Sequence, residues 1–557
     1  MIGESRIINM DKQNRMQEDN RMVTGSSWMT FGSLASRILG AIYIIPWMAW
    51  MGDQAEANAA HALYQMGYVP YTFFLAFATA GVPSAISKQI SYFNAIREYE
   101  ISKKIYKHGL ILMAITGFVS AMVLFFLAPT IAESSPAADQ NSATLVIRSL
   151  VPALLIIPIQ SVTRGLFQGH NRMREPAISQ IIEQLLRILF ILGSAYIIRQ
   201  VLNGDVVTAV TYSTFAAFVG AIFSMVYLFI RLKQIPTALN REYDESNNEV
   251  FISTPNLLKD IIKTSIPFVI MSTGLTVFNF IDQQTFAPLM NIFYPEISDS
   301  SIQVSYGIIQ GNAYKLSTII TSFGAALAIT SVPLMSDLIA KKRFSEVSYQ
   351  FERAIQLLMF IMIPAVIGMF VVAEPFYTFF YQYNEFGVHA TRVYAVTSLF
   401  LGLFLVMGNI LQSVNLRRKG IYSLAAGLVV KLISQPLFIR GIGELGILFS
   451  TMLGLMVTIF LMFKAMYDLT HYSIKFLARR TLLILILALI MGLATVLVSN
   501  ILGIFIDYNS RIQALFALLI IGGAGVVVYG YLTLKTRLAE KVIGSQALSL
   551  KQKLRIK

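Results

Sequence analysis

The sequence contains no cysteine, so it can form neither a disulfide nor a thiolate metal site. Charged residues make up only 13% of its 557 residues, whereas a soluble chain carries roughly 25%. Its five histidines fall in separate loops or helix ends, without the spacing of metal ligands: His61, His108, His170, His389 and His471. These shortages exclude an ordinary water-soluble domain and predict that the chain holds no metal and no cofactor.

Apolar runs of about 20 residues recur from Gly25 to Thr533, and each is close to the length that spans ~30 Å of hydrocarbon. Segments such as Leu482–Leu497 are apolar on every side, which is typical of helices and not of the alternating strands of a membrane barrel. We count fourteen spans, from 25–50 to 511–534. The predicted fold is therefore all-α, a polytopic membrane protein with fourteen transmembrane helices.

The distribution of positive charge predicts the orientation of these spans. If the N-terminus is inside, 35 of the 44 Lys and Arg residues fall in cytoplasmic segments. Lys and Arg in short loops are retained on that side of the membrane, so both termini are predicted to be cytoplasmic. The basic residues are spread over the membrane edges and do not form one face, so the net charge of +14 does not indicate nucleic-acid binding.

Internal repetition predicts two related halves. Four pairs of residues match at one constant offset: Gln168 with Gln412, Asn171 with Asn415, Arg174 with Arg418 and Ser179 with Ser423. Two bundles around a central site are common in transporters, and chance similarity of short basic loops is the alternative. The predicted divisions are a cytoplasmic tail (1–23), an N-lobe with spans 1–6 (24–232), a linker (233–258), a C-lobe with spans 7–12 (259–467), two added helices (468–535) and a basic tail (536–557).

The sequence shows no pattern of an intramembrane enzyme. It has no Gly-x-x-x-x-Gly-Lys-Ser/Thr phosphate loop, and no soluble segment is long enough for a nucleotide-binding domain. We therefore expect a transporter without cofactors, driven by the membrane potential or by a monovalent ion.

Charged residues inside the spans are the main functional clue, because each costs at least ~2.5 kcal/mol at the bilayer centre unless it faces a partner or a wet cavity. The basic candidates for substrate binding are Arg37, Arg148, Arg187, Lys315 and Lys431, and the acidic candidates for coupling or gating are Glu183 and Asp282. The balance is cationic, which favours an anionic substrate such as a pyrophosphate.

Several of these charges also have a purely structural explanation. Glu183 and Arg187 are four residues apart on one helix face and can neutralise each other. Arg148 can reach the outer interface, and Asp282, near the predicted end of span 7 (260–285), can contact solvent. Arg37 and Lys315 are the hardest to explain in this way, because neither has an obvious partner on its own helix.

Several motifs resemble those of the multidrug/oligosaccharidyl-lipid/polysaccharide exporter superfamily. They are Ser36–Gly40 in span 1, Asn312–Leu316 and Val332-Pro333 in span 8, and Gly165–Gly169 leading to Pro176–Gln184. More narrowly, the chain is similar to the lipid II flippases and sporulation-type polysaccharide transporters of Gram-positive bacteria. It lacks the second span-1 arginine of the Gram-negative flippases, where Tyr43 stands, and the Ala-Asp-Ala signature of span 2.

The resemblance implies a V-shaped pair of bundles in the bacterial cytoplasmic membrane, with a central cationic cavity and a groove for a polyprenyl tail along the added helices. By motif, Arg37 and Lys315 would carry the basic side chains of that cavity. The implied activity is flipping of lipid II, an undecaprenyl-pyrophosphate-linked precursor, to the outer leaflet, with the cell-wall synthesis machinery as a possible partner. Capsule or teichoic-acid precursors, a multidrug or cation antiporter, and a scaffold without transport activity remain alternatives.

Overall fold

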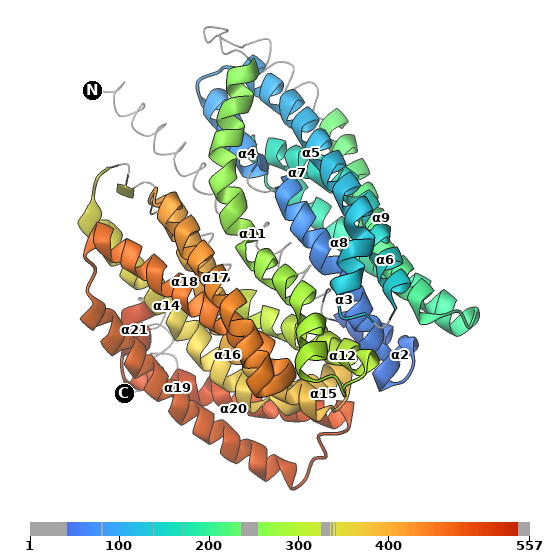
Figure 1. The fold of residues 1–557 in the computed structure, drawn as a ribbon. Coiled ribbons are helices and arrows are strands. Elements are labelled where there is room, and N and C mark those ends of the chain that lie inside the picture. The colour runs from blue at the N-terminus through green and yellow to red at the C-terminus, as the bar shows by residue number, and fades with distance from the viewer. Residues whose placement is uncertain are drawn as a thin grey trace. The chain divides into compact units, whose positions relative to one another are not determined.

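The computed structural model describes residues 40, 42–79, 82–137, 139–170, 172–234, 254–322, 324, 335, 338–339 and 341–543. Within these ranges the chain is helical and contains no β-strand (Figure 1). The described residues belong to two compact units. Unit 1 comprises Met1–Met51, Met66–Glu133 and Asp139–Thr276, and unit 2 comprises Gly52–Gln65, Ser134–Ala138 and Val277–Lys557.

Unit 1 is built from helices in which small residues permit close packing. In chain order the helices are α2 (Ile44–Met51), α3 (Gln54–Thr79), α4 (Val82–Ala95), α5 (Tyr99–Ser134), α6 (Gln140–Ser149), α7 (Val151–Gly169), α8 (Arg174–Tyr196), the π-helix η1 (Ile197–Val201) and α9 (Val206–Gln234). The first part of α3, up to Gln65, belongs to unit 2. Helix α8 packs against α9, where a Cβ on Gly220 would lie only 2.6 Å from the Glu183 carbonyl oxygen. Such close approach of backbones is typical of helices that pack in a membrane.

Unit 2 contains the remaining helices. They are α11 (Thr254–Phe293), which begins in unit 1, α12 (Asp299–Tyr306), the π-helix η2 (Gly307–Ala313), α14 (Phe344–Val371), α15 (Ala373–Tyr381), α16 (Glu385–Ser413), α17 (Arg417–Ile442), the 3₁₀ turn η3 (Gly443–Leu445), α18 (Gly446–Thr470), α19 (Ile474–Gly503), α20 (Arg511–Lys535) and α21 (Leu538–Ile543). Helices α17 and α18 form the most extensive helix pair, and α14 packs against α19 (Figure 1). A Cβ on Gly454 would lie 2.7 Å from the Gly427 carbonyl oxygen, which explains how closely α17 and α18 approach.

Among the described residues, nine segments are long and apolar enough to cross a membrane, and one of them, Arg417–Thr470, contains both α17 and α18. In the most apolar stretch of α5 only 22% of the residues are buried, as expected for a helix that faces lipid. The all-α membrane fold predicted from the sequence is confirmed. Most of the predicted first span (25–50) lies outside the described residues, and the count of fourteen stays a prediction.

The helices differ from the predicted spans in three places. Helix α11 continues to Phe293 and does not end near residue 285, because the chain stays helical well beyond its most apolar part. Predicted span 4 (144–168) is divided into α6 and α7 at Leu150, two residues before Pro152 in the first turn of α7. The short aromatic helix α15 between predicted spans 9 and 10 was not predicted, since nine residues are too few to span a bilayer.

Candidate functional site

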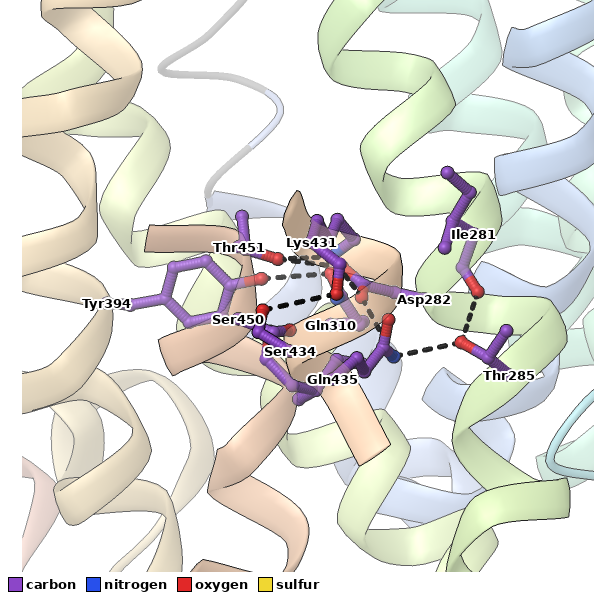
Figure 2. A network of polar contacts seen from close by, with 11 residues as sticks. Ile281, Asp282, Thr285, Gln310, Tyr394, Lys431, Ser434, Gln435, Ser450 and Thr451 are labelled. Carbon is purple, nitrogen blue, oxygen red and sulfur yellow. Dashed lines mark hydrogen bonds and ion pairs between the residues drawn. The ribbon is translucent and has the colours of Figure 1, made fainter. Parts of the chain in front are cut away.

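A buried ion pair lies in unit 2, between α11 and α17 (Figure 2). The Lys431 ammonium lies 2.5 Å from Oδ1 of Asp282, and the two side chains are 0% and 1% exposed. Removing two charges from water is costly, and the cost is recovered only when the geometry is good and further hydrogen bonds satisfy both groups. The sequence suggested that Asp282 lies near the end of a span and contacts solvent. The side chain is instead buried, and Asp282 lies well inside α11, which continues to Phe293.

Further polar groups satisfy both members of this pair. The Thr451 hydroxyl of α18 accepts a hydrogen bond from the Lys431 ammonium and donates one to Oδ2 of Asp282 at 3.2 Å. The Gln435 amide donates to Oδ1 of Asp282 at 3.4 Å and to the Thr285 hydroxyl at 2.8 Å. The Lys431 ammonium also lies 5.4 Å from the centre of the Phe278 ring, a cation–π contact. These contacts connect α11, α17 and α18 around one carboxylate.

The π-helix η2 contributes Gln310 to the same network. The Gln310 amide donates to Oδ2 of Asp282 at 3.4 Å, and its carbonyl oxygen accepts a hydrogen bond from the Tyr394 hydroxyl of α16 at 2.9 Å. Single π-helical turns within α-helices are frequently found at functional sites. Four helices and η2 therefore meet at the Asp282–Lys431 pair. We call the connected residues the Asp282 network; they are Asp282, Thr285, Gln310, Tyr394, Lys431, Gln435 and Thr451.

A second polar cluster lies beside η2. The Asn312 amide donates to Oδ1 of Asn58 at 2.9 Å and to the Tyr377 hydroxyl at 2.8 Å, while its carbonyl oxygen lies 2.6 Å from Nδ1 of His61. A Cβ on Gly311 would lie 2.7 Å from that imidazole nitrogen, so glycine is needed there. The sequence placed His61 in a loop or at a helix end, which is wrong: the residue is buried inside α3.

Unit 1 contains a different charge network, centred on Glu183 of α8. Its carboxylate lies 2.6 Å from Nη2 of Arg187 and 2.8 Å from Nη2 of Arg164 on α7, and it accepts a hydrogen bond from Gln160 at 3.2 Å. Arg164 also donates to the Ser179 hydroxyl at 2.8 Å. The Glu183–Arg187 pair expected from the four-residue spacing is confirmed. Arg164 was missed, because from the sequence it was counted among the cytoplasmic charges that set topology.

Arg187 and Lys431 are separated by the same offset as the four residue pairs of the predicted repeat, and each lies in an ion-pair network of its own unit. Their partners differ, because Arg187 pairs within its own helix whereas Lys431 pairs with Asp282 from another helix. The sequence identified both basic residues as charges inside predicted spans, but only the fold shows the carboxylate that each one contacts.

The remaining predicted site residues are Arg37, Lys315 and Arg148. Arg37 lies outside the described residues. Lys315 is half-buried, lies two residues after the end of η2 where the chain continues as α-helix, and interacts electrostatically with the His61 ring. Arg148, at the end of α6, places its guanidinium 4.6 Å from the centre of the Phe125 ring and donates from Nε to the Phe125 carbonyl oxygen at 3.4 Å.

An apolar groove runs along the added helices of unit 2. A cavity of about 620 Å³ lies between α14, α19 and α20, with Phe360, Pro364, Met491, Ile521 and Tyr529 among its lining residues. Glycines of α20, including Gly522, open space along this face. The groove has the apolar lining that a hydrocarbon chain requires.

Apolar helices with buried, neutralised charges define a multi-pass membrane transporter. Residues 22–339 match the family of polysaccharide biosynthesis proteins, and residues 310–437 match the MatE family. The chain belongs to the polysaccharide biosynthesis protein family, within the multidrug/oligosaccharidyl-lipid/polysaccharide exporter superfamily, and it is a multi-pass protein of the bacterial cytoplasmic membrane.

Two curated relatives show where the similarity lies. Lipid II flippase MurJ of Bacillus subtilis (strain 168) is 32% identical over 537 residues, which cover 94% of this chain and 97% of the relative. Stage V sporulation protein B of the same organism is 24% identical, over 73% of this chain and 76% of the relative. The similarity to the flippase MurJ therefore extends over nearly the whole chain, and both closely matching proteins and solved structures are membrane transporters.

Solved structures confirm the fold. Lipid II flippase MurJ in an inward closed conformation superposes with a TM-score of 0.61 at 14% identity, over 92% of this chain and 99% of that chain. An inward-facing multidrug resistance MATE transporter gives a TM-score of 0.58 at 16% identity, over 78% and 96%. At these identities the likeness concerns the fold alone.

Proposed function

We propose that the chain flips lipid II, an undecaprenyl-pyrophosphate-linked peptidoglycan precursor, from the inner to the outer leaflet by alternating access. The observation that supports this most strongly is the 32% identity to a lipid II flippase over 94% of the chain. Within the chain, the excess of basic over acidic residues inside the spans agrees with an anionic head group.

The charge networks divide the cationic candidates into two groups. Lys431 forms an ion pair with Asp282, and Arg187 forms one with Glu183. A ligand can therefore bind either basic group only if an existing ion pair breaks. By motif resemblance, Arg37 and Lys315 carry the basic side chains of the family's cavity, and we assign the first contacts with the pyrophosphate to them. Arg148, Arg187 and Lys431 follow as secondary contacts, and Arg187 and Lys431 reach the substrate only if their ion pairs rearrange during transport.

The groove between α14, α19 and α20 is proposed to hold the polyprenyl tail. Its lining is apolar along almost its whole length, so a hydrocarbon chain there leaves no polar group without a partner. With the tail in this groove, only the pyrophosphate and saccharide need to cross the membrane interior.

Energy for net transport is proposed to come from the membrane potential or a monovalent ion, because the chain has no nucleotide-binding motif. Asp282 and Glu183 are the candidate coupling or gating residues. Asp282 is the stronger candidate, since it receives hydrogen bonds from α17, α18 and η2 and a change in its charge would alter contacts with all three.

The proposal is tested with purified protein in liposomes that contain lipid II in the inner leaflet, with translocation measured by accessibility of the head group. Arg37→Ala and Lys315→Ala are expected to reduce the rate by about tenfold or more, since each removes a charge-assisted hydrogen bond to the pyrophosphate. Lys419→Ala is the matched control, because Lys419 forms an exposed pair with Asp468. No translocation by the wild-type protein, or full activity of both variants, would refute it.

Another lipid-linked saccharide is the second candidate cargo, favoured by the similarity to stage V sporulation protein B. A multidrug or cation antiporter is favoured only by the match to the MatE family over residues 310–437. Competition between lipid II and a cationic dye for the purified protein separates these cases, because an antiporter for cations would bind the dye and not lipid II. Direct contact with cell-wall synthesis enzymes is a further proposal, tested by crosslinking in the native membrane.

A further inference from the structure

A polar pocket lies next to the apolar groove in unit 2. This cavity of about 540 Å³ is formed by α14, α15, α16, α19 and the chain that follows α19. Its polar lining consists of Glu374, Arg392, Ser499, Asn500 and Tyr508, with Phe370 beside them. Neither the proposed translocation of lipid II nor the similarity to other proteins assigns a role to this pocket.

The pocket contains two opposite charges that do not neutralise each other. Among the described residues Arg392 has neither a hydrogen bond nor an ion pair, and its guanidinium carbon lies 5.9 Å from the centre of the Phe370 ring. Its Nε is buried and has no acceptor within the described part of the chain. The Glu374 carboxylate likewise has no partner there, although both side chains line one cavity. A buried donor without an acceptor is costly, so a ligand that supplies one would be bound favourably.

The position of the pocket matches the level of lipid head groups. Helices α14 and α19 end at Val371 and Gly503, and α15 and α16 begin at Ala373 and Glu385, so the pocket lies where helices leave the hydrocarbon. Tyr508, whose hydroxyl donates to the Ser499 carbonyl oxygen at 2.7 Å, is of the residue type enriched at this level. The charge distribution of the loops predicts that this side faces outward.

The apolar groove continues into the polar pocket along two helices. On α14 the groove is lined by Gly368 and the pocket by Phe370, and on α19 the groove is lined by Thr495 and the pocket by Ser499. An amphiphile is therefore the natural ligand, with its polar group in the pocket and its apolar chain in the groove when the polyprenyl tail of lipid II does not occupy it. The volume of about 540 Å³ is typical of a site for a small ligand or a small head group.

We propose that this pocket binds the head group of a zwitterionic phospholipid from the outer leaflet, with its phosphate on Arg392 and its primary amine on Glu374. The guanidinium supplies directed donors for phosphate oxygens, and the carboxylate supplies the acceptor for an ammonium. A phosphatidylethanolamine head group carries both charges. A phosphatidylglycerol head group carries only the phosphate and leaves Glu374 without a partner.

Native mass spectrometry of the purified full chain tests this assignment, with phosphatidylethanolamine and phosphatidylglycerol of the same acyl chains added in turn. The wild-type protein is expected to retain phosphatidylethanolamine about tenfold better. Glu374→Gln is expected to abolish this preference, and Arg392→Gln to reduce retention of both lipids. Glu385→Gln and Arg440→Gln are the controls, because Glu385 and Arg440 lie outside the pocket on the same side.

Equal retention of both phospholipids by the wild-type protein overturns the proposal, as does unchanged retention by Arg392→Gln. Stronger retention of lipid II than of either phospholipid, lost in Arg392→Gln, overturns the choice of a phospholipid. If Arg392→Gln does not fold, judged by its thermal unfolding, the preference measured on Glu374→Gln decides alone. Retention is measured without translocation, so a failure here is distinguishable from a failure of the flippase proposal.

Discussion

At the level of single residues, the two charge networks differ in how many partners surround the acidic group. Glu183 contacts two arginines, whereas Asp282 has Lys431 as its cationic partner among the described residues. Removing one member of a buried pair leaves an uncompensated charge and typically costs about 3–5 kcal/mol. The loss of Lys431 is therefore more serious for unit 2 than the loss of Arg187 is for unit 1.

We predict that Lys431→Met lowers the stability of the detergent-solubilised protein by about 3–5 kcal/mol, whereas Arg187→Met costs less, because Arg164 still neutralises Glu183. The Asp282→Leu/Lys431→Met double variant is expected to recover most of this loss, since it removes both charges. Thermal unfolding of the four proteins measures these differences. Equal losses for Lys431→Met and Arg187→Met would show that the number of partners does not matter.

The same double variant separates structure from transport. If the Asp282 network only holds helices together, a stable double variant flips lipid II at the wild-type rate. If Asp282 couples transport to an ion or to the membrane potential, the double variant is stable but loses net transport. The liposome assay with and without an imposed potential distinguishes these outcomes.

Residue types and spacings in the sequence identified part of the candidate site. The four-residue spacing of Glu183 and Arg187 gave their pairing, and the repeat offset connected Arg187 with Lys431. The partnership of Lys431 with Asp282 could not be predicted, because the two residues are 149 positions apart and no local rule links them. Gln310 was missed for another reason, since an uncharged side chain in an apolar run gives no signal until the fold brings it to Asp282.

At the level of helices, contacts between small residues fix the packing of α17 on α18. We predict that Gly454→Ala destabilises the protein by about 1–3 kcal/mol, because its methyl group would lie only 2.7 Å from the Gly427 carbonyl oxygen. Gly441→Ala is the matched control, since a Cβ at Gly441 meets no atom within 4 Å. Thermal unfolding in detergent measures both variants, and a similar effect of the two would contradict the packing argument.

The start of α6 gives a pH-dependent prediction outside the membrane-spanning helices. Asp139 caps this helix by accepting hydrogen bonds from the backbone N–H groups of Asn141 at 3.2 Å and Ser142 at 2.9 Å. Hydrogen bonds from the Ser142 hydroxyl and backbone lower the pKa of Asp139 below its usual value of 3.8. A carboxylate with a lowered pKa stabilises the fold above its usual pKa, and this stability is lost as the pH falls through the lowered value.

We therefore predict that Asp139→Ala weakens the first turn of α6 by about 1 kcal/mol at neutral pH. Amide hydrogen exchange at residues 141–143 should become roughly fivefold faster in the variant at pH 7. The difference between the variant and the wild-type protein should shrink as the pH falls below 3.8. A difference that is constant across this range would mean that the Asp139 charge is not what caps α6.

At the level of helical elements, the sequence predicted the helices better than their internal irregularities. Long apolar runs gave α5, α9, α19 and α20, because length and hydropathy suffice for a membrane span. The π-helix η2 has the same composition as an α-helical turn, so nothing in its sequence distinguishes it. Tertiary packing of Gly307 and Gly311 against α3 accompanies it, and such packing cannot be seen in one sequence.

At the level of the whole molecule, the flippase proposal makes a prediction for the native cell. Depletion of the protein is expected to cause accumulation of lipid II in the inner leaflet, followed by loss of cell shape as peptidoglycan assembly stops. Mass spectrometry of lipid-linked intermediates measures this. Accumulation of a capsule or teichoic-acid precursor instead would redirect the cargo, and re-expression of the Lys419→Ala variant is the control expected to restore growth.

The π-helical turn at Gly307–Ala313 also limits how the chain can change in length. One residue added to or removed from a helix rotates everything beyond it by about 100° relative to everything before it. Deletion of Ile309 would therefore rotate the residues after it relative to those before it. The hydrogen bond from Gln310 to Asp282 or the one from Asn312 to Asn58 would then be lost, although the deletion removes no polar side chain. Insertions and deletions between homologues should thus be rare within this segment and common in the chain around 504–510.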